Sequence, residues 1–346
     1  MRIVRSLVPL VIALALAGAV LAQSAAAQGA VEPLSPRETV RVAYVAITKF
    51  GTLFVAADRG IFDKYGLDVE INRVASGTEA IAFLEQGQID VGGIAIVVSL
   101  WNGWAQGLDL RVIAPGGLEP FVNSPTKLML RADLAATVTD IADLRGRTVA
   151  VAGGPGSGGE YLAAKALERG GLTIFDVNLV NVANPDIPLS FESRAIDAAI
   201  LGAPFADQAE AGGAAVPFAE DLTPGLMTVA FVGSGRFVQE RPEVARRFAL
   251  AMLEASRLMQ GEELFSRENL DAFLTFLPNA TEEALRSGAP VVYDPNQQIP
   301  VDGLADVERT HRENGRTAYE VPIDLGAVVD LSFMGWALEQ LGAHGE

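Results

Sequence analysis

Cysteine is missing from this sequence, and histidine is scarce. The 346 residues contain no cysteine and two histidines, His311 and His344. Without cysteine there are no disulfide bonds, thiolate metal sites or cysteine nucleophiles, and no cysteine can carry a lipid anchor. A histidine-based metal site or a Ser/His/Asp triad would depend on His311, because His344 lies near the chain end, where chains fray. His311 lies in a charged stretch, residues 308–313, which predicts a solvated helix face. We therefore expect no catalytic residue, no metal site and no cofactor.

The sequence also has few positively charged residues relative to negatively charged ones. The chain has 26 lysines and arginines against 43 aspartates and glutamates, a formal net charge of −17. Nucleic-acid partners require basic patches that neutralise phosphates, so this composition argues against them. It suits a soluble protein that does not adhere to an anionic membrane surface. A phosphate-binding P-loop is missing too, which excludes an ATPase subunit.

The first 27 residues have the pattern of an export signal. Arg2 and Arg5 form a basic start, residues 7–21 are a nearly uninterrupted apolar run, and residues 25–27 are alanines, the small side chains that signal peptidase requires. The alternative is a retained membrane anchor, but the run is shorter than the about 20 residues that span a bilayer. We predict cleavage near Ala27 and a soluble, periplasmic protein that is not a lipoprotein.

Apolar runs and helical patterns alternate along the rest of the chain, and the length fits two domains. This alternation is typical of α/β proteins with parallel sheets. Strands are predicted at 40–47, 67–74, 89–94, 110–114, 148–152, 177–182 and 198–201. Helices are predicted at 53–65, 78–86, 97–106, 157–169, 187–194, 205–211, 267–277, 281–288, 301–315 and 328–341. A further helix that begins at Pro242 carries an apolar stripe, expected to face the core, of Val244, Phe248, Met252 and Met259.

A pseudo-repeat divides the chain into two lobes. A helix end, an Ile-Asp pair and a small-residue strand occur at 83–92 and again at 191–200. Two matching α/β units are therefore expected. Apolar runs predict two hinge strands between the lobes, at about 127–131 and 227–233. Lobe one would then hold residues 38–126 plus 234–346, and lobe two would hold residues 132–226.

The most specific candidate site is the glycine-rich loop at residues 154–159. It follows a predicted strand and opens a predicted helix, where free N–H groups favour an anion. We expect Gly156, Ser157 and Gly158 to bind a ligand. The loop also matches the GxGxxG pattern of dinucleotide sites, but the acid that would hold a ribose is missing after the next strand. A plain glycine-rich turn is the other alternative.

Further candidate binding residues follow other predicted strands, where ligands of open α/β sheets bind. Ser76, Gly77 and Thr78 precede a helix, so the alternative is a simple helix cap. Lys49 could act as a counter-ion, or could be solvated only. The remaining candidates are at equivalent strand ends: Thr48, Phe50, Ala95, Ala203 and Phe205.

Four motifs together resemble the nitrate/sulfonate/taurine family of ABC solute-binding proteins. They are residues 60–69 (GIFDKYGLDV), 87–92 (GQIDVG), 143–150 (DLRGRTVA) and 196–205, which begins IDA and ends PF. Together they cover roughly residues 40–260 in the family's order. The resemblance implies a type II periplasmic binding protein fold with two hinge crossings. It also implies a monomer that binds a small-molecule solute between its lobes and delivers it to separately encoded ABC permease and ATPase subunits.

The resemblance leaves the solute open. Two serine-containing loops without a fixed charge favour a small organic anion, such as a sulfonate or carboxylate. The alternative is a neutral heterocycle, such as a pyrimidine precursor, stacked on Phe50 or Phe205. The fold also includes a related pyrimidine synthase, which relies on a cysteine-rich motif and a reactive histidine. Because this chain has no cysteine, we expect that it is not an enzyme.

Overall fold

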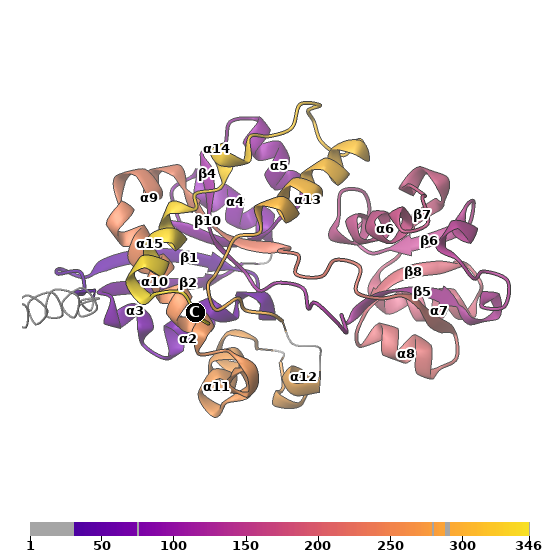
Figure 1. Cartoon of the computed structure of the whole chain (residues 1–346), viewed down its shortest axis with the longest axis horizontal. Helices are drawn as coiled ribbons and strands as arrows, with labels where there is room; N and C mark the ends of the chain where they lie inside the picture. The colour runs from indigo at the N-terminus through magenta and orange to yellow at the C-terminus, as the bar shows by residue number, and fades with distance from the viewer. Residues whose placement is uncertain (1–30, 75, 279, 288–290, 346) are drawn as a thin grey trace, which may run out of the picture.

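The computed structural model describes residues 31–74, 76–278, 280–287 and 291–345. The predicted export signal, residues 1–27, lies outside this part of the chain. Within it, no helix has both the length and the apolar character that crossing a membrane requires. Figure 1 shows two lobes side by side along the long axis, each built around its own sheet.

The first sheet has five strands in the order β2-β1-β3-β10-β4. Strand β1 pairs in parallel with β2 and β3, and β10 runs antiparallel between β3 and β4. The sheet is therefore mostly parallel, with one reversed strand supplied from much later in the chain. The strands are β1 (Glu38–Tyr44), β2 (Leu67–Arg73), β3 (Val91–Ala95), β4 (Leu110–Pro115) and β10 (Val229–Ser234).

Helices cover both faces of this sheet, and the long helix α10 (Pro242–Arg257) is central to the core. Its predicted apolar stripe is buried, with at most 5% of each residue exposed, and Met259 lies just beyond the end of the helix. The single helix predicted at 53–65 is two helices, because Gly60 adopts a left-handed conformation (φ 65°) between them. The other helices of this lobe are α2 (Gly51–Asp58), α3 (Ile61–Lys64), α4 (Gly77–Glu85), α5 (Val98–Ala105), α9 (Gly235–Glu240), α11 (Arg267–Phe276), α12 (Glu282–Ser287), α13 (Val301–Glu313), α14 (Leu325–Val328) and α15 (Ser332–Leu341).

The second sheet repeats this plan in the order β7-β6-β8-β5-β9. Strand β6 pairs in parallel with β7 and β8, and β5 runs antiparallel to β8 and β9. Strand β9 was not predicted, because it is a short edge strand that contains Pro217, and proline weakens a strand pattern. The elements are β5 (Thr126–Arg131), β6 (Thr148–Val151), α6 (Gly158–Glu168), β7 (Asn178–Asn181), α7 (Ile187–Glu192), β8 (Ala198–Gly202), α8 (Phe205–Ala211) and β9 (Ala215–Ala219).

The Ile-Asp pairs of the pseudo-repeat have matching structural roles. The Asp90 carboxylate accepts the backbone N–H of Arg41 at 2.9 Å, and the Asp197 carboxylate accepts that of Thr148 at 2.9 Å. Each aspartate also pairs with an arginine, Asp90 with Arg41 and Asp197 with Arg131. The two motifs therefore link neighbouring strands by hydrogen bonds in each lobe. The expected α/β fold with two mostly parallel sheets is confirmed.

The chain crosses between the lobes in two segments that belong to no helix or sheet strand, 116–125 and 220–228 (Figure 1). They touch each other, since Glu119 donates its backbone N–H to the carbonyl of Leu226 at 2.9 Å. The predicted hinge strands occupy different positions: β5 covers 127–131 and most of 227–233 lies in β10, and each strand belongs to one sheet. We propose that bending between the lobes occurs in the two crossing segments, because they lie outside both sheets.

Candidate binding cavity between the lobes

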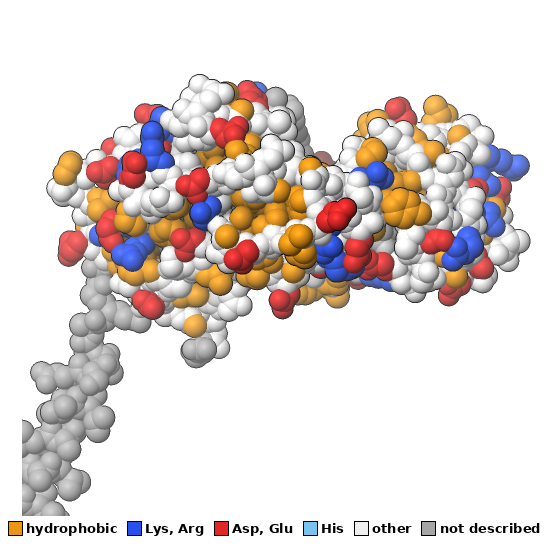
Figure 2. Space-filling model, turned by 90° about the horizontal axis from the view of Figure 1, so that it is seen from above, with side chains coloured by type: hydrophobic (Ala, Val, Ile, Leu, Met, Phe, Trp, Pro, Cys, Tyr) orange, Lys and Arg blue, Asp and Glu red, His pale blue; other side chains and the backbone are white. Residues whose placement is uncertain are grey.

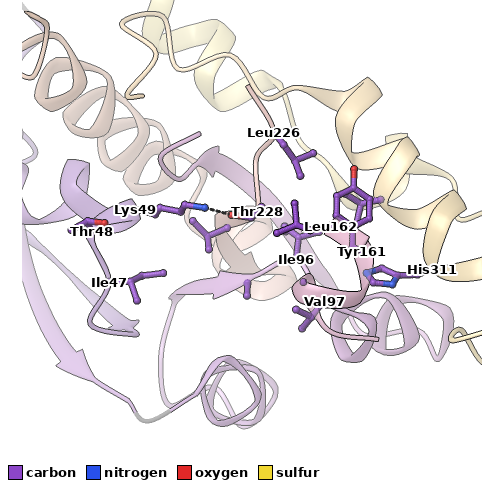
Figure 3. Close-up of a pocket in the computed structure, with 14 residues that line it drawn as sticks. Ile47, Thr48, Lys49, Ile96, Val97, Tyr161, Leu162, Leu226, Thr228 and His311 are labelled. Carbon is purple, nitrogen blue, oxygen red and sulfur yellow. Dashed lines mark hydrogen bonds between the residues drawn. The ribbon is translucent and has the colours of Figure 1, made fainter. Parts of the chain in front are cut away.

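A cavity of about 400 Å³ lies between the lobes, with walls from both (Figure 3). The first lobe contributes the loops that follow β1 and β3, the second crossing segment and α13, and the second lobe contributes the start of α6. This position, at the carboxyl ends of strands, is where open α/β sheets bind ligands. Most of the lining is apolar: Ile47, Ala95, Ile96, Val97, Leu162, Leu226, Val229 and Val307.

Lys49 is the positively charged group at one end of the cavity. Its ammonium group pairs with the Glu119 carboxylate and donates to the hydroxyl of Thr228 at 2.6 Å. Only 21% of the lysine side chain and 14% of the glutamate side chain are exposed. An ammonium group has three donors, and the described residues supply acceptors for two of them. Lys49 is therefore a partly neutralised donor rather than a free counter-ion.

His311 forms part of the opposite wall, and the predicted solvated helix face is wrong. The residue is 1% exposed, because α6 of the second lobe covers this side of α13. Burial lowers the pKa of His311, although the nearby Glu160 charge acts in the other direction. The imidazole is therefore neutral near pH 7. Its Nδ1 atom has no hydrogen-bond partner among the described residues.

A buried ion pair joins α6 to the segment after α13. The Glu160 carboxylate is fully buried and accepts hydrogen bonds from the Arg316 guanidinium, from Nε at 2.9 Å and from Nη2 at 2.8 Å. It also accepts the backbone N–H of Gly156 at 3.2 Å. A buried carboxylate without such partners would be costly. The pair therefore requires the two lobes to lie against each other on this side of the cavity.

The next residue of α6 makes a second polar contact with α13. The Tyr161 hydroxyl donates to Asp306 at 2.8 Å, and the Lys165 ammonium reaches the same carboxylate at 3.1 Å. Burial, helped by the hydrogen bond to Asp306, raises the pKa of Tyr161, so its hydroxyl stays protonated. Figure 2 shows acidic and basic side chains gathered on the surface where the two lobes meet. Polar pairs thus seal the edge of an otherwise apolar cavity.

Four of the predicted site residues line this cavity: Thr48, Lys49, Ala95 and Gly158. Gly156 lies at the lobe boundary, because a Cβ atom on it would stand 3.0 Å from a methyl group of Val98 in the first lobe. Its φ of +76° also favours glycine.

Ser157 belongs to its own loop and helix. Its hydroxyl donates to the Ala152 carbonyl at 3.1 Å and accepts the backbone N–H of Glu160 at 3.2 Å. The donor of Ser157 is therefore already used, and the side chain is the N-cap of α6.

The other predicted site residues lie elsewhere. Phe50 is 1% exposed and packs on Phe231 with ring centroids 5.4 Å apart, so the prediction that it stacks on a ligand is wrong. It fails because the helical turn after β1 directs this ring into the core. Outside the cavity lie the start of α4, where Ser76 is an exposed N-cap, and the start of α8. The residues at these two helix starts are Ser76, Gly77 and Thr78, and Ala203 and Phe205.

Sequence reasoning missed the part of the site that comes from α13 and the second crossing segment. A signal did exist for α13, because Leu304, Val307 and His311 share one helix face at spacings of three and four. For Thr228, Leu226 and the second-lobe residue Tyr161 no local pattern indicates a cavity. Among the described residues, no cluster of histidine, cysteine, aspartate or glutamate could hold a metal ion.

Two sequence comparisons relate this chain to known proteins. The family model described as NMT1-like matches residues 34–273. A binding protein of Brucella abortus (strain 2308) is 26% identical over 242 residues, which cover 62% of this chain. The match spans 65% of that relative's own length, just under two thirds.

Solved structures show the same architecture in proteins of different activity. The periplasmic aliphatic sulphonate binding protein of Escherichia coli is similar with a TM-score of 0.65 and 16% identity, over 86% of this chain and 99% of that one. A desulfurization enzyme is similar with a TM-score of 0.59 and 19% identity, over 88% of this chain and 100% of that one. At such identities the likeness demonstrates the fold and leaves the activity to the site.

Proposed function

The chain belongs to the NMT1-like family, and from that premise we propose that it is an extracytoplasmic solute-binding receptor of an ABC importer. The observation that supports this most directly is the cavity whose walls come from both lobes. A solute held there contacts both lobes at once, so its binding energy favours the closed arrangement over an open one. Opening at the two crossing segments would release it.

The proposal includes location and partners. The export signal predicted at residues 1–27 would direct the protein to the periplasm, where the mature chain is a free monomer. Separately encoded permease and ATPase subunits would receive the solute. The aliphatic sulphonate binding protein of Escherichia coli, which shares the fold, is itself described as periplasmic.

The cavity favours a small organic anion with an apolar body. Its volume of about 400 Å³ lies near the lower end of the about 300–1,000 Å³ typical of ligand pockets. The apolar lining would bury a hydrocarbon skeleton, and a fully hydrated inorganic ion would gain little there. Near Thr48 and Thr228, the remaining Lys49 donor suits a carboxylate or sulfonate head. A neutral heterocycle is the alternative, because Glu119 already balances the lysine charge.

We propose that the chain is a binding protein and not an enzyme, although an enzyme shares the fold. The pyrimidine-synthase-like branch suggested by the sequence resemblance relies on cysteines, and this chain has none. His311 is buried in the cavity wall, and its Nδ1 atom has no partner to orient it among the described residues. General bases are usually oriented by such a partner.

A thermal-shift screen of sulfonates, carboxylates, nitrate and pyrimidines tests the proposal. A solute that binds the folded state raises the melting temperature by mass action. Organic anions should give the largest shifts, and NMR of the recovered solute should show it unchanged. If only neutral compounds shift the curve, the anion class is wrong. If no compound shifts it, or if a compound is converted, the receptor function is wrong.

Lys49→Gln tests the anion head directly. Losing a charge-assisted hydrogen bond should weaken binding of the best anion by roughly tenfold to a hundredfold. The matched control is Lys127→Gln in β5, whose lysine pairs with Glu220 away from the cavity. Equal affinity in the Lys49 variant and the wild-type protein would contradict an anion at this position.

A further inference from the structure

The cavity has two polar ends separated by apolar side chains. Figure 3 shows Lys49 and Thr228 on one side, His311 and Tyr161 on the other, and Ile96 with Leu162 between them. The proposed function assigns a ligand group to the Lys49 end only. The His311 end lies on α13, which follows the region shared with the family, residues 34–273.

The imidazole of His311 is one of the buried polar groups without a hydrogen bond to the described residues. It is 1% exposed, and its Nδ1 atom makes no hydrogen bond to any described residue. Buried polar groups in native proteins are nearly always satisfied, and an exception points to a ligand or a bound water. The cavity is the space that His311 lines.

The polar side chains beside His311 are committed to other partners. Glu160 is held by Arg316 from two nitrogens, at 2.9 and 2.8 Å. The Tyr161 hydroxyl donates to Asp306 at 2.8 Å, and its ring stands 6.0 Å from the imidazole. Breaking either contact to serve His311 would leave a carboxylate with fewer partners, and the Glu160 carboxylate is fully buried. A group in the cavity can therefore supply a partner only to the imidazole nitrogen that is not enclosed, Nε2.

We propose that the solute carries a second hydrogen-bonding group, which is uncharged and binds the imidazole of His311. The proposal rests on the proposed function and names its substrate class: a bifunctional organic acid with the acid head at Lys49 and a hydroxyl or amide group at the far end. His311 is then a specificity-determining residue. Helix α13, which lies outside the region matched by the family model, then determines which acid binds.

The second group is uncharged for a physical reason. The wall around His311 consists of Val307, Leu162 and the Tyr161 ring, and the nearby carboxylate and guanidinium neutralise each other. A second charge on the solute would be buried there without a counter-ion, which is costly. In one tautomer of a neutral histidine a given ring nitrogen accepts a hydrogen bond, and in the other tautomer it donates one. A hydroxyl group can both donate and accept, so it suits either tautomer.

Matched pairs of acids test the proposal by calorimetry on the mature protein. The probes are benzoate and 4-hydroxybenzoate, cyclohexanecarboxylate and its 4-hydroxy derivative, and benzenesulfonate and 4-hydroxybenzenesulfonate. In at least one pair the hydroxylated acid should bind about threefold to tenfold more tightly, the value of one net hydrogen bond. His311→Leu should remove that preference, so that the two members of the pair bind with equal affinity. His311→Gln should retain part of the preference, and His344→Leu is the matched histidine control.

Three results would overturn the proposal. The hydroxylated and plain acids could bind equally to the wild-type protein. His311→Leu could weaken both members of a pair to the same degree, which would indicate a structural role. No member of any pair could bind; the bifunctional class would then be wrong, while a shift by another compound in the wider screen would leave the receptor function intact.

Discussion

Around the cavity, the charged side chains have partners that lie far away in sequence. Lys49 pairs with Glu119, and Glu160 pairs with Arg316. Removing one member of a buried pair leaves an uncompensated charge, so such pairs are expensive to break even where they add little net stability. His311 differs, because burial keeps it neutral and its Nδ1 atom has no described partner.

His311 should make folding stability depend on pH. Burial holds its pKa below the ordinary value of about 6.5, so between the two values the unfolded chain binds a proton that the folded protein does not. The stability contribution of this residue therefore falls as pH drops below about 6.5. The groups facing the ring are Glu160, which raises the pKa, Arg316, which lowers it, and the protonated hydroxyl of Tyr161.

Melting curves at pH 7.5, 6.5 and 5.5 measure this effect by difference. As pH falls, the wild-type protein should lose stability relative to His311→Leu, while His344→Leu should track the wild type. A wild-type-to-variant difference that is constant over this range would contradict a buried neutral His311.

At the scale of single elements, the start of α6 combines a helix cap with a contact between lobes. Ser157 caps the helix by accepting the Glu160 N–H, and the loop before it brings Gly156 against Val98 of the first lobe. Gly158 and Tyr161 then line the cavity. The orientation of this helix therefore determines where the second-lobe wall stands.

Ser157→Ala should act on stability more than on solute binding. Losing an N-cap costs about 1 kcal/mol, which denaturant unfolding would detect as a lower midpoint. Ser76→Ala, which removes the exposed N-cap of α4, should cost a similar amount. If Ser157→Ala instead weakens solute binding tenfold to a hundredfold with unchanged stability, the hydroxyl contacts the solute directly, as the glycine-rich loop suggested from sequence.

At the scale of the whole molecule, two kinds of connection join the lobes. The two crossing segments connect the lobes through the polypeptide chain itself, and they lie side by side. The Glu160–Arg316 and Tyr161–Asp306 contacts also join the lobes, but they are non-covalent and can break and form again. We propose that bending at the crossing segments requires breaking these polar contacts. The polar contacts of α6 with α13 and the segment after it should therefore set how readily the cavity opens.

Arg316→Gln should shift the protein toward an open arrangement. The missing cysteines make labelling simple, since cysteines introduced at the exposed positions Gln208 and Glu320 would be the only two. Electron–electron distance measurements between spin labels should show longer or broader distances in Arg316→Gln without solute. Arg316→Lys should retain part of the closed population.

The control is Arg267→Gln, which removes an exposed ion pair on α11. Identical distance distributions in the wild-type protein and Arg316→Gln would show that the buried pair does not hold the lobes together.

The sequence alone determined the family, the α/β class and most elements, because apolar periodicity and glycine or proline punctuation act within a few residues of each other. Two local features were predicted wrongly from the sequence. Gly60 divides one predicted helix into two, and the edge strand β9, which contains a proline, was not predicted. Thr48, Lys49, Ala95 and Gly158 were found because strand ends in such folds gather at one edge.

Only the tertiary structure decided which side chains are buried and paired. Lys49 and Glu119 are 70 residues apart, and Glu160 and Arg316 are 156 apart, so no local pattern could indicate either pair. His311 has charged sequence neighbours, yet α6 from the other lobe buries it. Phe50 follows a strand end, yet a helical turn directs it into the core. Burial and pairing depend on what folding brings close from distant parts of the chain, and those contacts decide which residues form the cavity.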